Sequence, residues 1–350
     1  MGEMTRPSPQ LESLKIELHS LWNSRSWRLL RPLRNIARRR HGLSTETEPE
    51  VTTVEDAARA IEAIHRSLSW KMTTPLRMVH SVLVPPPPPP PTAEEIYTGR
   101  LRAVGPLIDR YAKETAVSPA IHPTDHIFRY ILEHSKKPTD EERVQHYFED
   151  GANSARQLAE IVHKYCGNLE RKPQLLEFAS GYGCVTRHLA KEQTFEAEAC
   201  DIHPAAIEFI QNTLGVRAVQ SAALPEMFEV PHQYDVVFAL SFFSHMPITT
   251  WARWLVRLTQ CVRPGGVIAF TTHGAATIEA HRNPEIGPLG FWFSPSSEQS
   301  DLSTEEYGST IALESFVRKN IQSIPFVELA ELRPAYWWNF QDLWILRKTR

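Results

Sequence analysis

The sequence contains no run of about 18 apolar residues, so it predicts no membrane-spanning helix. Cysteine is scarce and forms no CxxC pair, which argues against a zinc site or a disulfide framework and favours buried thiols in a reducing compartment. The net charge is only −3, so the chain as a whole does not attract nucleic acid. The first ten residues lack the apolar core of a signal peptide. These absences predict a cytoplasmic protein. The cysteines are Cys166, Cys184, Cys200 and Cys261.

Residues 1–50 form a basic amphipathic segment that differs from the rest of the chain. Leucines recur there at helical spacings of three and four residues. Seven arginines follow between Arg25 and Arg40. Residues 44–56 are acidic and threonine-rich, which suggests a solvated linker. The leucines are Leu11, Leu14, Leu18 and Leu21.

Residues 51–93 are predicted to be a helix followed by a linker. Ile61, Ile64 and Leu68 mark a short amphipathic helix. Prolines occupy every position from 85 to 91 and can join neither a helix nor a sheet. We expect them to form a stiff polyproline II spacer about 20 Å long.

Residues 94–170 are predicted to be a mostly helical lead-in, and the pattern of apolar residues changes after them. In residues 171–350, short apolar segments alternate with helix-like ones. That alternation is typical of a parallel sheet with crossover helices, so we predict an α/β fold there. The expected strands are QLLEFA, FEAEACDI, YDVVFAL and GVIAFTT.

The first expected strand stops at a carboxylate and then turns through glycines, in LLEFASGYGCVTRHLA. Glu177 ends the strand, and Gly181 and Gly183 form a tight corner before a helix. Glycines at such a corner let the backbone approach a ligand and present amide groups to it. The next strand ends at Asp201, about 20 residues later, where an acidic residue can accept hydrogen bonds from ribose hydroxyls. The pattern predicts a nucleoside-containing cofactor.

Two features of the corner distinguish between cofactors. A dinucleotide-binding GxGxxG turn has a third small residue, and this chain has Thr186 at that place. Glu177 would repel a pyrophosphate but attract a ligand that carries an amine and a sulfonium. S-adenosylmethionine has both groups, which favours it over a nicotinamide cofactor.

The same stretch resembles the first motif of the class I S-adenosylmethionine-dependent methyltransferases, E/D-x-G-x-G-x-G. Glu177, Gly181 and Gly183 match it, and Ala179 replaces the first glycine. The resemblance covers residues 150–350 and implies a Rossmann-like seven-stranded sheet whose last strand is antiparallel. PFVELAELR and QDLWILRKT would supply the final hairpin. Later segments resemble further motifs of the family in order: ACDIHPAAIEFI, VRAVQSAALPEMF, YDVVFALSFFSHMP and LVRLTQCVRPGGVIAFTTHG.

The resemblance implies an S-adenosylmethionine site beyond the strand ends. Asp201 would bind the ribose, and Ser221 and Ala222 would lie beside the adenine, where the family often has an acidic residue. Simpler roles stay open: the glycines could form an ordinary turn, and Asp201 could cap the helix that begins near Pro204. The implied cofactor-binding residues are Glu177, Ala179, Gly181, Gly183, Asp201, Ile202, Ser221, Ala222 and Ser241.

Methyl transfer from a sulfonium mainly requires alignment of the nucleophile, and a hydroxyl acceptor also benefits from a base. His245 and His273 follow the fourth and fifth strands and are the candidate catalytic residues, because histidine titrates near neutral pH. The alternative is that His245 packs structurally at the start of a helix; His273 is evenly balanced between the two roles. No His/Cys/Asp cluster has metal-ligand spacing, so we predict no metal.

A long connection follows His273 and is either a functional lid or a packed cover over the sheet. Its aromatic rings and carboxylates suit a sugar-like or other polyol acceptor. Trp337 and Trp338 either line the pocket or, as the favoured alternative, pack in the hairpin core. The residues noted in the connection are Phe291, Trp292, Phe293, Glu298 and Tyr307.

The stretch LWNSRSWRLLRPLRNIARRR is similar to an S-x-SWR-L-x-x-PLR segment found beside bacterial surface-polysaccharide enzymes, notably glycosyltransferases. Through residues 11–40, its apolar side chains would rest on a membrane or a protein partner while the arginines meet anionic lipid. A disordered basic tail is the alternative. No RNA-binding motif accompanies the arginines, so nucleic acid is not expected as a partner. The apolar residues are Trp22, Trp27, Leu29, Leu30, Leu33 and Ile36.

Taken together, these patterns predict an S-adenosylmethionine-dependent methyltransferase with an N-terminal helical extension. Its acceptor would be a hydroxyl of a sugar or glycan precursor in surface-polysaccharide synthesis, in the cytoplasm or peripherally at the inner face of the membrane. A small-molecule acceptor is one alternative. A non-catalytic, methyltransferase-like scaffold that docks polysaccharide machinery through the arginine segment is another.

Overall fold

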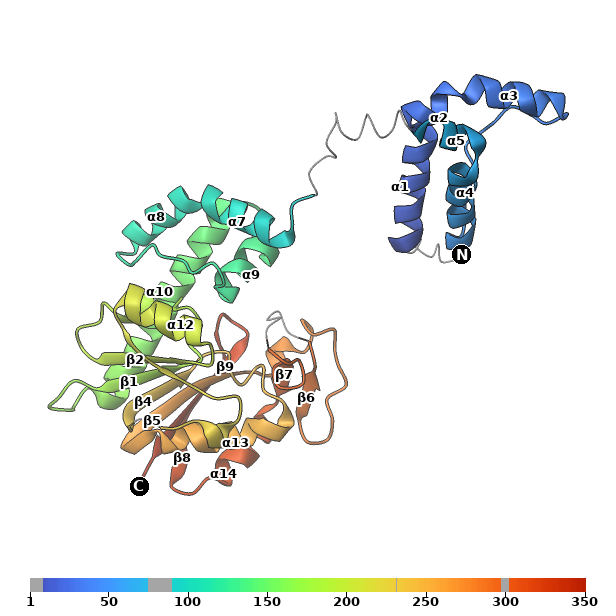
Figure 1. Cartoon of the computed structure of the whole chain (residues 1–350). Coiled ribbons are helices and arrows are strands. Elements are labelled where there is room, and N and C mark those ends of the chain that lie inside the picture. Colours follow the sequence, from blue (N-terminus) through green and yellow to red (C-terminus); the bar gives the residue numbers. More distant parts are fainter. Residues whose placement is uncertain (1–8, 75–89, 231, 297–301) are drawn as a thin grey trace. The chain divides into compact units, whose positions relative to one another are not determined.

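The computed structural model describes residues 9–74, 90–230, 232–296 and 302–350. Most of the predicted proline spacer and Glu298 therefore lie outside the described residues. The chain divides into two units, residues 1–90 and 91–350 (Figure 1). Within these described ranges, no helix is both long and apolar enough to cross a bilayer, and no three His, Cys, Asp or Glu side chains gather as a metal site.

The N-terminal unit is a small helical cluster. α1 and α4 lie side by side and bury their apolar stripes against each other (Figure 1). Trp22 and Trp27 complete this core and are only 6% and 4% exposed. The prediction that these two rings face a membrane or a partner is therefore wrong. The helices are α1 (Pro9–Asn23), α2 (Arg25–Leu29), α3 (Arg31–Arg40), α4 (Val54–Arg66) and α5 (Leu68–Met72).

The second unit begins with the predicted helical lead-in. Thr92 and Thr139 start α7 and α10 with reciprocal capping boxes to Glu95 and Glu142, so the local sequence specifies where both helices begin. Buried aromatic and aliphatic residues, including Tyr147, hold the four lead-in helices together. They are α7 (Ala93–Ala103), α8 (Gly105–Glu114), α9 (His126–His134) and α10 (Asp140–Cys166).

A seven-stranded sheet follows in the order β3-β2-β1-β4-β5-β9-β8. The first five strands pair in parallel, and β9 runs antiparallel to both β5 and β8. This confirms the predicted Rossmann-like sheet and its final hairpin. The strands are β1 (Gln174–Phe178), β2 (Glu196–Asp201), β3 (Arg217–Gln220), β4 (Tyr234–Ala239), β5 (Val262–His273), β8 (Val327–Trp337) and β9 (Gln341–Lys348).

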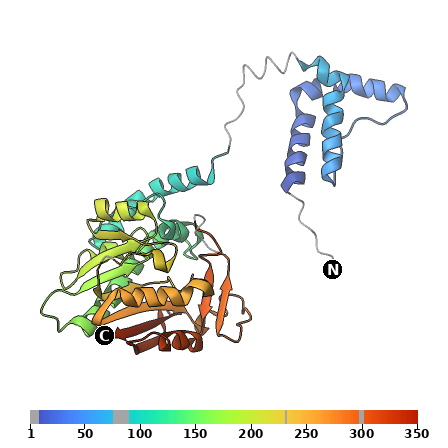
Figure 2. The same ribbon diagram turned by 60° about the horizontal axis from the view of Figure 1, so that its bottom comes forward.

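Both faces of the sheet are covered, which explains why consecutive residues at the centre of its inner strands, such as Leu175–Leu176 and Val236–Val237, are all apolar and buried. Leu176 and Val237 point to the face under α13, which Figure 2 shows in orange across the sheet. Leu175 and Val236 point to the other face, under α10. The remaining helices are α11 (Thr186–Leu189), α12 (Pro204–Phe209), α13 (Ile248–Gln260) and α14 (Glu314–Gln322).

The long connection after β5 contains a two-stranded sheet of β6 (Phe291–Ser294) and β7 (Ser309–Ala312). Its backbone is joined to the loop after β4, because the amides of Gly308 and Thr310 donate to the carbonyls of His245 and Ser244. Phe291 is buried in the sheet core. The described part of the connection therefore packs against the sheet, as one of the two alternatives expects, and it also reaches the site described below.

Candidate functional site

A cavity of about 250 Å³ lies beyond the carboxyl ends of the parallel strands. It is centred where the strand order reverses between β1 and β4, the switch point at which open α/β sheets bind ligands. All of the predicted cofactor-binding and catalytic residues line this cavity except Gly183 and His273. The lining set is Glu177, Ala179, Gly181, Asp201, Ile202, Ser221, Ala222, Ser241 and His245.

The corner after β1 has a left-handed backbone. Ala179, Gly181 and Gly183 have φ of 59°, 56° and 83°. A Cβ on Gly181 would meet nothing within 4 Å, whereas one on Gly183 would lie 2.6 Å from a methyl carbon of Leu214. Gly181 therefore keeps the cavity wall open, and Gly183 allows close packing of the segment after α12.

Asp201 is oriented by the corner itself. Its Oδ2 accepts a hydrogen bond from the Gly181 amide at 2.8 Å. Its Oδ1 accepts from the amide and Nδ1 of His203, at 3.0 and 2.8 Å. The helix-capping alternative is wrong, because His203 is the N-cap of α12 and no side chain caps that helix. Each carboxylate oxygen has further lone pairs with which to accept ribose hydroxyl hydrogens.

Glu177 is buried at the end of β1. Burial raises the pKa of its carboxyl to about 8; the nearby Asp201 charge adds to the rise, and a hydrogen bond from Thr186 Oγ1 opposes it. With no cation beside it, most of this group is protonated at pH 7. A cationic amine placed beside it would favour the ionised form, so the site gains a carboxylate when such a ligand binds.

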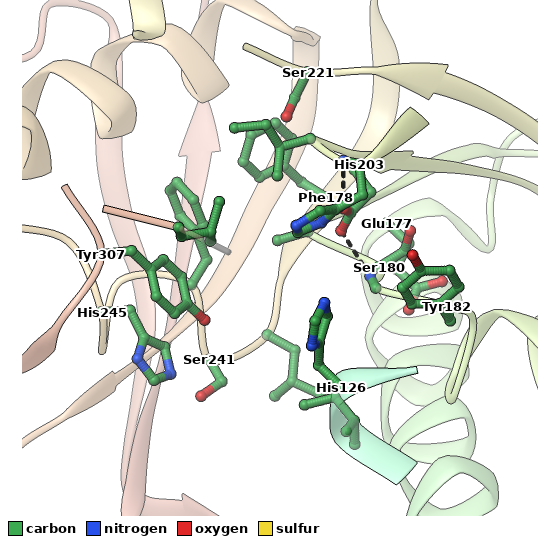
Figure 3. Close-up of a pocket in the computed structure, with 18 of the residues that line it drawn as sticks. His126, Glu177, Phe178, Ser180, Tyr182, His203, Ser221, Ser241, His245 and Tyr307 are labelled. Carbon is green, nitrogen blue, oxygen red and sulfur yellow. Dashed lines mark hydrogen bonds and ion pairs between the residues drawn. The ribbon is translucent and has the colours of Figure 1, made fainter. Parts of the chain in front are cut away.

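The other end of the cavity is formed around Ser241 and His245, after β4. Ser241 has a strained φ of 55° and donates its amide hydrogen to Thr271 Oγ1 at 2.8 Å. The His245 ring stacks on Tyr307 with centroids 4.5 Å apart. Figure 3 shows these three side chains on one side of the cavity, opposite Glu177.

The tautomer of His245 follows from its hydrogen bond. Its Nδ1 lies 2.8 Å from the carbonyl oxygen of Gly308. A carbonyl can only accept, so Nδ1 carries the hydrogen and Nε2 carries the lone pair of the neutral ring. His245 therefore lines the cavity with a ring that is fixed by its hydrogen bond to Gly308 and by its stacking on Tyr307.

The structure does not bring His273 to the cavity. Burial, helped by the nearby His245 and His281, lowers the pKa of His273 to about 3, so its ring is neutral and a weak base at pH 7. Gln341 Nε2 donates to His273 Nε2 at 3.1 Å and to Ser241 Oγ at 3.0 Å. His273 thus supports the position of Gln341 behind Ser241.

Several cavity residues were missed by sequence reasoning, and most come from distant segments. His126, at the start of α9, points into the cavity between its two ends (Figure 3). Asp125 caps that helix and also accepts from Tyr147 Oη, and Thr124 Oγ1 donates to Tyr182 Oη. The cap pattern before α9 is visible in the sequence, but its approach to the strand ends depends on tertiary packing.

The two consecutive tryptophans at the end of β8, Trp337 and Trp338, have different surroundings. Trp337 is fully buried in the core, as favoured from the sequence. Trp338 is partly buried against the same core and also lines the cavity, so both predicted roles apply to this residue. Its Nε1 donates to Asp150 Oδ1. The tight turn between β8 and β9 points the two consecutive rings in different directions. From the connection after β5, Leu302, Glu306 and Tyr307 also line the cavity.

Comparison with known proteins gives one family. Residues 176–268 match the family described as a methyltransferase domain. They include the glycine corner, Asp201, His245 and most of β5. No curated protein matches the chain.

Solved structures similar to this chain include methyltransferases. One, an S-adenosylmethionine-dependent methyltransferase from Clostridium acetobutylicum ATCC 824, is 10% identical at a TM-score of 0.41, over 57% of this chain and 91% of that one. Another is the amino pentose methyltransferase CalS10 from Micromonospora echinaspora, 13% identical at a TM-score of 0.41, over 57% of this chain and 92% of that one. Similarity at this level does not bear on the acceptor.

Proposed function

We propose that this chain, whose residues 176–268 match a methyltransferase domain, is a class I S-adenosylmethionine-dependent methyltransferase that methylates a hydroxyl of a sugar or glycan precursor in surface-polysaccharide synthesis. One observation carries the proposal: a single cavity joins the Glu177–Asp201 end to a wall of hydroxyl, imidazole and aromatic groups. The polysaccharide context is supported by the N-terminal resemblance, and the free cysteines support a cytoplasmic reaction.

The residues at the strand ends fit the cofactor. S-adenosylmethionine, when bound, supplies an electrophilic methyl group on a sulfonium. Glu177 would hold its ammonium group, and Asp201 would accept hydrogen bonds from the ribose hydroxyls. Ser221 and Ala222 would border the adenine. Gly181 exposes its backbone to the cavity without a side chain, so the ligand can approach closely there.

At the other end, the chain's own groups would bind and deprotonate the acceptor. Ser241, Tyr307 and Glu306 offer polar contacts to a polyol, and Trp338 offers an aromatic face. His245 would accept the hydroxyl proton at Nε2 while the oxygen takes the methyl group. The electron pair of the broken carbon–sulfur bond would remain with the cofactor, so the products would be the methyl ether and S-adenosylhomocysteine. The protein's main contribution is alignment of the oxygen, with proton transfer to His245 as a second one.

The proposal is tested by calorimetric titration of S-adenosylmethionine into the intact chain and into Asp201→Ala. We expect micromolar binding by the wild type and at least a roughly 100-fold loss in the variant, because charged hydrogen bonds are removed. Asp109→Ala, at an exposed position of α8, is the matched control and should bind normally. Transfer of labelled methyl groups to a panel of sugars and sugar phosphates then tests the acceptor class.

The two parts of the proposal fail separately. A folded wild-type chain that does not bind the cofactor would favour the non-catalytic scaffold. Cofactor binding with transfer only to non-sugar acceptors would keep the methyltransferase and reject the glycan assignment.

A further inference from the structure

Helix α3 in the N-terminal unit has an inner and an outer face, and none of its ten residues is buried. Arg31, Arg34 and Arg38 recur on the inner side and are only partly exposed. Leu33, Ile36 and Arg40 recur on the outer side at a helical spacing of three and four residues. The helix therefore presents a stripe that its own unit does not use.

The inner arginines orient the helix. Arg34 forms an ion pair with Glu46, donates to the Trp27 carbonyl at 2.8 Å and stacks over the Trp27 ring. Arg38 Nε donates to the carbonyl of Ser44 at 2.8 Å. Segment 43–48 and the tryptophan core thus hold the inner face, and the outer face points to solvent.

The outer face combines apolar groups with cations. Leu29, Leu33 and Ile36 are 61%, 62% and 51% exposed, although they are large and apolar. Arg28, Arg39 and Arg40 are exposed beside them, and within residues 9–74 no ion pair is recorded for these three. We refer to these six residues as the basic-apolar face. It contains no carboxylate, and the acidic residues of the described range 9–74 lie on α1, on α4 and in residues 46–50.

We infer that the basic-apolar face binds the surface of an anionic phospholipid membrane. Exposed aliphatic side chains can enter the boundary between headgroups and acyl chains while arginines meet anionic headgroups. Leu33, Ile36, Arg39 and Arg40 lie on α3, and Arg28 and Leu29 lie at the end of α2 just before it. The short helix α3 therefore already presents both kinds of group. The contact differs from the one predicted from sequence, because Trp22 and Trp27 are in the core and the aliphatic residues take their place.

Other occupants explain less of this face. Nucleic acid would use the arginines but leave Leu33 and Ile36 in water. A second copy of the same face would bring like charges together without a carboxylate to compensate them. A membrane satisfies both the charge and the apolar side chains. The inference is independent of methyl transfer, because none of these residues belongs to the catalytic unit.

The test is co-sedimentation of the full chain with vesicles. We expect binding to mixed phosphatidylglycerol and phosphatidylcholine vesicles, and little binding to phosphatidylcholine alone. Arg39→Gln with Arg40→Gln should weaken binding about tenfold or more. Leu33→Ser with Ile36→Ser should weaken it comparably without changing charge. The matched control is Arg59→Gln with Arg66→Gln, which removes the same charge from α4, where these arginines pair with Asp56 and Glu62.

Cofactor affinity and melting temperature should be unchanged in both α3 variants, which separates this test from the fold and from the proposed reaction. The inference is overturned if the anionic vesicles do not bind the chain. It is also overturned if the control pair weakens binding as much as the α3 pair. If the Leu33→Ser, Ile36→Ser variant still bound anionic vesicles and the chain bound a random RNA tightly, the face would be assigned to nucleic acid instead.

Discussion

The two ends of the cavity are built in different ways. At the proposed cofactor end, Glu177, Gly181 and Asp201 come from one strand–turn–helix–strand unit, and the Gly181 amide donates a hydrogen bond directly to the Asp201 carboxylate. At the acceptor end, the wall combines His126, the loop after β4, the connection after β5 and the turn before β9. The first end is a local motif, whereas the second exists only after the chain has folded. Changes at the two ends should therefore separate cofactor binding from turnover.

The largest separation is expected from His245→Ala. If His245 accepts the hydroxyl proton, kcat should fall about 100- to 1,000-fold while cofactor affinity stays within about twofold. The measurement is steady-state methyl transfer together with calorimetry. Partial rescue by added imidazole would support the role as a base. An unchanged kcat would leave His245 as a packing residue.

The second prediction compares the two glycines of the corner after β1. Gly183→Ala should destabilise the protein by about 2 kcal/mol. Alanine would have to adopt the left-handed φ of this position, and its Cβ would also clash with Leu214. Gly181→Ala has the backbone strain without the clash and should cost about 1 kcal/mol. Urea unfolding of both variants checks the difference. Equal losses would show that the contact with Leu214 relaxes freely.

Glu177→Gln should weaken S-adenosylmethionine binding about tenfold, since a neutral amide attracts an ammonium group less strongly than a carboxylate does. In the wild type, the pKa of about 8 means that cofactor binding at pH 7 should release a proton. Calorimetry in buffers with different ionisation enthalpies measures that release, which should be absent in Glu177→Gln. Equal proton release by both proteins would contradict this role.

The same residue predicts how stability changes with pH. The Glu177 pKa rises from an ordinary 4.5 to about 8 on folding, so between these values the folded state holds a proton that the unfolded chain has released. The contribution of Glu177 to the free energy of unfolding is therefore fully present below pH 4.5 and is lost as the pH rises through 8. Over this range the free energy of unfolding falls by at most about 1.4 kcal/mol per pH unit. Urea unfolding from pH 5 to 8 should show a flatter profile for Glu177→Gln than for the wild type.

The smallest effect is expected from Ala179→Gly. Glycine would relieve the left-handed strain at φ 59° but would also gain conformational freedom in the unfolded chain. The two effects oppose each other, so stability should change by less than about 1 kcal/mol. Cofactor affinity should be kept, because glycine is the usual residue of the motif. A large loss of affinity would show that the Ala179 methyl group contacts the ligand.

The sequence predicted the end of the cavity that is built from one local motif better than the end that is assembled from distant segments. The strand ends, the glycine corner and the final hairpin could be predicted because each depends on residues close together in the chain. His273 was misleading, since its position just past β5 suggested the cleft rim and only the packed structure shows that it lies behind Gln341. His126 could not be found, because nothing near α9 in the sequence indicates which strand ends it approaches.

The N-terminal unit shows what an amphipathic pattern leaves undecided. Its amphipathic pattern was visible, but the pattern did not reveal which apolar residues form a core and which stay exposed. Trp22 and Trp27 are inside and Leu33 and Ile36 are outside because α1 packs against α4 and Arg34 anchors α3 to the Trp27 ring. Arginine and aliphatic residues alternate too evenly in this stretch for periodicity to distinguish the two faces.

The sequence by itself determined the α/β sheet, the glycine corner and the Glu177–Asp201 pair, since apolar periodicity and backbone conformation act over a few neighbouring residues. Only the tertiary structure decided which histidine faces the cavity, which of the two adjacent tryptophans lines it, and which face of α3 is exposed. Those outcomes depend on contacts between segments up to about 200 residues apart, because burial and orientation are properties of the packed chain.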